Sequence, residues 1–72
     1  MYLMWMDQSK RPISEKVRDA IAAYREKHGK SPREALIPAA LLDGTPDGQV
    51  DGVQVIGRHD IGRLLVYVGD ND

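Results

Sequence analysis

One amphipathic segment constrains the fold of this chain more than any other feature. Between residues 12 and 28, apolar, aromatic or histidine side chains recur at spacings of three and four: Ile13, Val17, Ala20, Ile21, Tyr24 and His28. The residues between them are mostly charged or small, so the spacing predicts a helix over 12–28 with one buried stripe. Pro12 suits the first helical turn, and Gly29 suits a left-handed C-terminal cap. The chain must therefore supply one surface on which this stripe packs.

Short apolar runs on either side of the helix supply that surface. The run "YLMWM" predicts a strand at 2–6, and because it shows no alternation we expect both of its faces to be covered. The runs at 53–57 and 63–69 predict two further strands, which lie close enough in sequence to form a β-hairpin. The Asp-Gly-rich segment 43–52 predicts a surface loop, and residues 70–72 predict a frayed tail.

The segment 32–42 allows two interpretations. Ser31, Pro32 and Glu34 fit a helix start with a capping box, which would predict a second helix over 32–42. In such a helix Pro38 would remove a backbone hydrogen bond and clash with the preceding turn, at a cost of about 3 kcal/mol. We therefore favour a strand at 34–37 followed by a helical turn at 38–42.

These elements predict one small α+β domain over residues 1–72. The strand at 2–6, the helix and the strand at 34–37 form a β-α-β unit, whose crossover places the helical stripe on one face of the sheet. The hairpin 53–57/63–69 follows it. The predicted architecture is a three- to four-stranded mixed sheet with one main helix packed on one face.

Composition excludes several classes of protein. The chain has no cysteine, which excludes a disulfide framework, a thiolate zinc site and a cysteine nucleophile, and which favours the cytoplasm. The apolar run at the start is too short for a signal peptide or a membrane helix. The formal net charge of −1 gives no global support to nucleic-acid binding, which draws its affinity from neutralising phosphates.

The order of helix, Gly, Pro and strand is typical of many small bacterial and phage proteins.

No pattern in the sequence predicts catalysis, a metal or a cofactor. Three Asp-Gly pairs, at Asp43, Asp47 and Asp51, stand four residues apart and no Glu closes the series, so an EF-hand calcium loop is excluded. The sequence has no nucleophile elbow, P-loop or dinucleotide fingerprint, and two histidines without cysteine do not make a closed zinc site. We predict that the protein is not an enzyme.

Two groups of cations are candidate anion sites. Arg58, His59 and Arg63 lie in the segment "GRHDIGR", where the arginines could grip a phosphate or carboxylate; the alternative is a hairpin connection with solvated charges. Lys10, Arg11 and Lys16 surround the start of the predicted helix, where phosphate contacts are favourable, although Glu15 and Asp19 weaken that field. A nucleic-acid-associated regulator would use Arg11, Lys16, Arg58 and Arg63.

The apolar run at the start of the chain is a candidate interface. Tyr2, Met4, Trp5 and Met6 are residue types that favour interfaces, and they either belong to the core or form an exposed face or strand edge. The function we expect first is a non-catalytic interaction or accessory module, binding another protein or a second copy of itself. Its partner is not identified by the sequence.

Overall fold

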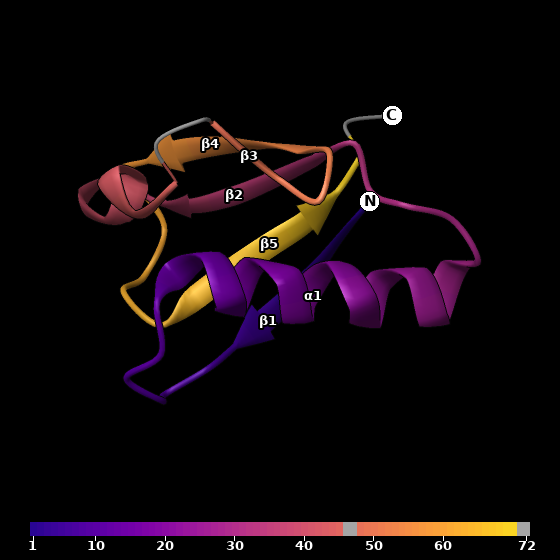
Figure 1. Cartoon of the computed structure of the whole chain (residues 1–72), viewed down its shortest axis with the longest axis horizontal. Coiled ribbons are helices and arrows are strands. Elements are labelled where there is room, and N and C mark those ends of the chain that lie inside the picture. Colours follow the sequence, from indigo (N-terminus) through magenta and orange to yellow (C-terminus); the bar gives the residue numbers. More distant parts are fainter. Residues whose placement is uncertain (46–47, 71–72) are drawn as a thin grey trace.

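A computed structural model describes residues 1–45 and 48–70 of the chain (Figure 1). Its elements in chain order are β1 (Tyr2–Met6), α1 (Ile13–His28), β2 (Glu34–Pro38), the short 3-10 helix η1 (Ala39–Gly44), β3 (Gln49–Val50), β4 (Val53–Arg58) and β5 (Leu65–Gly69). The predicted fold class is confirmed, because one main helix packs on a mixed sheet. The sheet has five strands instead of the three to four predicted.

The main helix ends where the sequence predicts. Pro12 is the N-cap and α1 begins at Ile13, one residue later than expected. Gly29 has a φ of 72°, the left-handed conformation that glycine adopts without strain, and its N–H donates to the Arg25 carbonyl oxygen at 2.8 Å. The following segment forms β2 and then η1, as favoured, so the alternative of a second helix over 32–42 is wrong.

The sheet has the order β1-β5-β2-β4-β3. β5 pairs antiparallel with both β1 and β2, so β1 and β2 run in the same direction with β5 inserted between them. β2 pairs parallel with β4. The predicted β-α-β unit is therefore present in a split form, in which α1 connects two parallel strands that do not touch.

The predicted hairpin between 53–57 and 63–69 is wrong. Both strands exist, but β2 lies between β4 and β5 and pairs with each of them. The hairpin of this fold joins β3 to β4 instead, inside the predicted surface loop, and its turn residues Asp51 and Gly52 have φ angles of 52° and 79°. Two-residue hairpin turns of type I′ require positive φ at both positions, which Asp-Gly supplies. Residues 46–47 of the predicted loop and 71–72 of the predicted tail lie outside the described residues.

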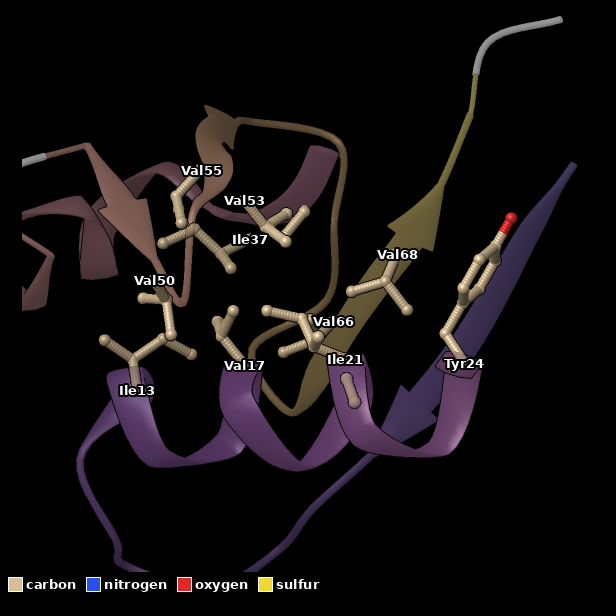
Figure 2. Packing of buried hydrophobic residues seen from close by; sticks show 12 residues of the cluster. Ile13, Val17, Ile21, Tyr24, Ile37, Val50, Val53, Val55, Val66 and Val68 are labelled. Carbon is tan, nitrogen blue, oxygen red and sulfur yellow. The ribbon is translucent and has the colours of Figure 1, made fainter. Parts of the chain in front are cut away.

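The hydrophobic core lies between α1 and one face of the sheet (Figure 2). The stripe of α1 meets alternate residues of the strands; the buried set is Ile13, Val17, Ala20, Ile21, Tyr24, Ala35, Ile37, Val50, Val53, Val55, Val66 and Val68. η1 covers the same face at Gly57, where an added Cβ would lie 3.2 Å from Ala39 Cα. Both helical elements therefore lie on one side, and neither covers the opposite face.

Candidate interaction surface

The face of the sheet that no helix covers is mostly apolar, although Glu34, Gln54 and Arg58 also lie on it. We call it the open face; its apolar side chains are Tyr2, Met4, Met6, Leu36, Ile56, Leu65 and Tyr67. The strand registers place Met4 opposite Tyr67, Tyr67 opposite Leu36, and Leu36 opposite Ile56. These four side chains form one continuous row across four strands, in which the Tyr67 hydroxyl donates to Met4 Sδ at 3.5 Å. Apolar surface of this continuity is typical of a binding site.

The residues of the predicted interface divide between the two faces of β1. Tyr2, Met4 and Met6 lie on the open face, where Met4 is 53% exposed and Met6 is 56% exposed. Trp5 lies on the helix side and packs, with Leu3, against the core. The expectation that both faces of this strand are covered is therefore wrong, because α1 covers only the side of Leu3 and Trp5.

One edge of the sheet, formed by β1, has unpaired backbone groups. Beyond the strand ends, the Asp7 N–H donates to Leu64 O at 3.1 Å and the Asp70 N–H donates to Met1 O at 3.2 Å, in the β1–β5 register. Hydrogen-bonded pairs alternate with non-bonded pairs in antiparallel ladders, so the odd-numbered residues of β1 bond to β5. The N–H and C=O groups of Tyr2, Met4 and Met6 therefore point away from the sheet, and no strand in the described ranges pairs with them.

This free edge lacks the features that normally protect sheet edges from pairing. Tyr2–Met6 contains no charged residue, no proline and no glycine. Proteins usually shield edge strands with lysine, proline, bulges or very short strands. The opposite edge of the sheet fits that rule, since β3 has only two residues. The edge formed by β1 is therefore the part of the sheet best suited to accept another strand.

The cations of the candidate anion loop do not converge on one position, because Arg58 and Arg63 line two different pockets. Arg58 forms a two-pronged ion pair with Asp60, with Nε–Oδ1 and Nη2–Oδ2 distances of 2.8 and 2.7 Å. The Asp60 hydrogen bonds raise the pKa of Arg58, and the Arg58 guanidinium lowers the pKa of Asp60. The charge of Arg58 is thus matched within the loop, and His59 is exposed beside it. Arg63 lies apart from these two residues and lines a pocket together with Lys16.

Two of the three cations around the start of α1 also form ion pairs or hydrogen bonds within the chain. Arg11 forms ion pairs with Asp7, at 2.7 Å, and with Asp19. Hydrogen bonds from Ser9 and then Arg11 hold the pKa of Asp7 well below its usual range, and bonds to Asp19 and then Asp7 raise the pKa of Arg11. Lys16 Nζ donates to the Asp7 carbonyl oxygen at 3.1 Å. Of this group, Lys10 is exposed, and no described residue forms an ion pair with it.

Four residues of the open face were not singled out in the sequence: Leu36, Ile56, Leu65 and Tyr67. The sequence does indicate that Leu65 and Tyr67 share one face of their strand, because they alternate with the buried Val66 and Val68. Alternation identifies two faces of a strand but does not tell which face the helix covers. The strand order was also needed to place Leu36 between Tyr67 and Ile56.

The described residues hold no group of three or more His, Asp or Glu side chains arranged to bind a metal ion. In the ranges 1–45 and 48–70, no helix has the length and apolar character needed to cross a membrane. Comparison with protein-family models, curated proteins and solved structures found no match to this chain.

Proposed function

We propose that this protein is a non-catalytic interaction module that associates with a second copy of itself through the free edge of β1. The observation that carries this proposal is the outward direction of the Tyr2, Met4 and Met6 backbone groups on an uncharged apolar strand. Strand addition satisfies such groups with main-chain hydrogen bonds.

The register of β1 suits antiparallel pairing with itself. If the two-fold axis passes through Met4, then Met4 faces Met4 of the second copy and Tyr2 faces Met6. Every outward-pointing residue then meets another outward-pointing residue, which allows about six interchain hydrogen bonds. A shift by one residue would place outward groups opposite inward groups and lose these bonds. A two-fold interface of this kind is the commonest form of self-association.

The side chains agree with the same register. On the open face, Tyr2 and Met6 of the two copies become neighbours around a central Met4 pair, which extends the apolar row across the junction. On the helix side, Leu3 of one copy faces Trp5 of the other. Both residues are only partly buried in the single chain. Pairing would bury more apolar surface on both faces of the sheet. Removal of apolar surface from water is favourable by about 25 cal/mol per Å².

The charges of β1 and of the whole chain favour a second copy of this protein as the partner that pairs with β1. No Asp, Glu, Lys, Arg or His lies within Tyr2–Met6, so at neutral pH the pairing of two β1 strands brings no charged side chain of β1 into the junction and opposes no like charges there. The formal net charge of the chain is −1, which leaves little long-range repulsion between copies.

The nucleic-acid alternative has weaker support. Arg11 and Arg58, two of the four residues that it would use, are paired with carboxylates of the chain itself. We retain a cytoplasmic location, argued from the absence of cysteine, and a bacterial or phage-derived origin as parts of the proposal.

The experiment is size-exclusion chromatography with light scattering over a range of protein concentrations. Met4→Pro removes an outward N–H and no bond to β5, so the fold should tolerate it while pairing is blocked. Met4→Lys places two ammonium groups against each other at the axis. We expect the wild type to form dimers at high concentration and both variants to remain monomeric.

Gln54→Lys is the matched control, because Gln54 is exposed on the same face but lies in β4. This variant should dimerise like the wild type. A wild type that stays monomeric at all concentrations contradicts self-association. Dimerisation that survives Met4→Pro but is lost in Gln54→Lys would show that the open face, and not the edge of β1, is the contact.

A further inference from the structure

A pocket of about 770 Å³ lies at the end of the sheet where β2 and β5 separate. The pairing of these strands ends at Leu36 and Tyr67, although β2 continues to Pro38 and β5 begins at Leu65. Pro38 has no N–H with which to continue a ladder. The space is bounded by η1, by the segment before β5 and by the first turns of α1, which meet at the left in Figure 1.

The wall of the pocket is mostly apolar and includes side chains that are unusually exposed for their type. Leu41 is 37% exposed, Leu64 is 43% exposed, and Met6 also lines the pocket. Small-ligand sites combine such an apolar lining with a few polar groups that fix orientation, and they commonly enclose 300–1,000 Å³.

The polar groups at this pocket are two cations. Lys16 and Arg63 both line it, and among the described residues its wall contains no Asp or Glu. Lys16 uses one of its three donors on the Asp7 carbonyl oxygen. No described residue forms an ion pair with Arg63. The structure thus brings together one cation from each of the two separate groups in the sequence.

We propose that this pocket binds an apolar monocarboxylate, a small molecule with a hydrocarbon chain and one carboxylate. The chain lies against Leu41, Leu64 and Met6, and the carboxylate accepts hydrogen bonds from Lys16 and Arg63. Charge complementarity selects the anion, because a neutral or cationic head group would leave both cations without a partner. The proposal does not require dimerisation through β1, although Met6 belongs both to this pocket and to the open face.

The test is an NMR titration with sodium decanoate below its micelle-forming concentration, with decanol and decylammonium as probes of equal chain length. We expect saturable binding of decanoate, with shifts at Leu41, Leu64 and Leu65, and at least tenfold weaker binding of the other two probes. Arg63→Gln and Lys16→Gln should each weaken decanoate binding about tenfold, the usual scale for one charge-assisted hydrogen bond.

Arg33→Gln is the matched control, since it removes the same charge at the opposite end of β2 and lies outside the pocket. Its affinity for decanoate should equal that of the wild type. If Lys16→Gln disturbs the fold, Arg63→Gln decides the question alone, because Arg63 is exposed. The proposal is overturned if decanoate does not bind, if decanol binds equally well, or if Arg33→Gln weakens binding as much as Arg63→Gln.

Discussion

The Tyr2 hydroxyl donates a 2.6 Å hydrogen bond to Glu34 Oε2 across an intervening strand. Tyr2 belongs to β1 and Glu34 to β2, and the residue of β5 that faces both of them is Gly69. Because Gly69 has no side chain, nothing from β5 stands between the two on the open face. This contact ties the edge strand β1 to the centre of the sheet, and so it supports the edge on which the proposed pairing depends.

Tyr2→Phe should destabilise the protein in a pH-dependent manner. The hydrogen bond to Glu34, and then burial, raise the pKa of Tyr2 above its ordinary value of 10.0. A raised pKa means that the contribution to stability is complete below about pH 10 and is lost as the pH rises further. Thermal unfolding should show the wild type to be more stable than Tyr2→Phe at pH 8, with the difference shrinking at higher pH. An equal difference at pH 8 and pH 11 would contradict this account.

Gly69→Ala should disrupt the pairing of β1 with β5. A Cβ at this position would lie 2.1 Å from the Met1 carbonyl oxygen and 2.9 Å from Tyr2 Cα, and neither backbone atom can move aside without displacing the strand. We expect a loss of at least about 1–3 kcal/mol in urea denaturation, the usual scale of overpacking. Gly62→Ala is the control: its nearest contact is Leu65 Cδ1 at 3.4 Å, so its midpoint should stay close to that of the wild type.

Asp7→Asn should make the stability of the protein less sensitive to acid. The pKa of Asp7 is held below its ordinary value of 3.8 by Ser9 and Arg11. A lowered pKa gives stability that is present above about pH 4 and is lost as the pH falls through the folded-state pKa. Urea midpoints from pH 7 to pH 2 should therefore fall less steeply in Asp7→Asn. Asp43→Asn removes the same charge from the exposed end of η1. That control should fall as steeply as the wild type.

Ile21→Val should cost about 0.5–1.5 kcal/mol, because it removes one buried methylene from the centre of the core. Ile21 is fully buried and lies in the stripe of α1 that faces β5 (Figure 2). Ala22 follows it on the exposed side of the helix, so Ala22→Ser provides a control that should stay within about 0.5 kcal/mol. Equal losses for the two variants in urea denaturation would argue against this packing.

The sequence was most informative where local chemistry decides the structure. The spacing of Ile13, Val17 and Ile21 identifies the helix and its buried side without reference to the rest of the chain. Gly29 and Pro38 mark the end of that helix and the absence of a second one, since both act through the backbone itself.

Strand order could not be read in the same way. The runs at 53–57 and 63–69 are neighbours in sequence, which favours a hairpin, but the insertion of β2 between the two strands depends on non-local pairing. The residues of the candidate site could not be fully predicted for the same reason, because their exposure depends on contacts in the folded chain. Whether Met4 or Trp5 faces α1 depends on the register of β1 against β5, and whether Arg58 is available depends on its pairing with Asp60.

Amide hydrogen exchange at β1, measured at low and high protein concentration, tests the central claim most directly. The Met4 and Met6 amides point away from β5, so they should exchange rapidly in the monomer and slowly at concentrations where the two β1 strands pair. The Leu3 and Trp5 amides bond to β5 and should be protected at both concentrations. If the Met4 amide exchanges as rapidly at high concentration as at low concentration, the edge of β1 is not the self-association site.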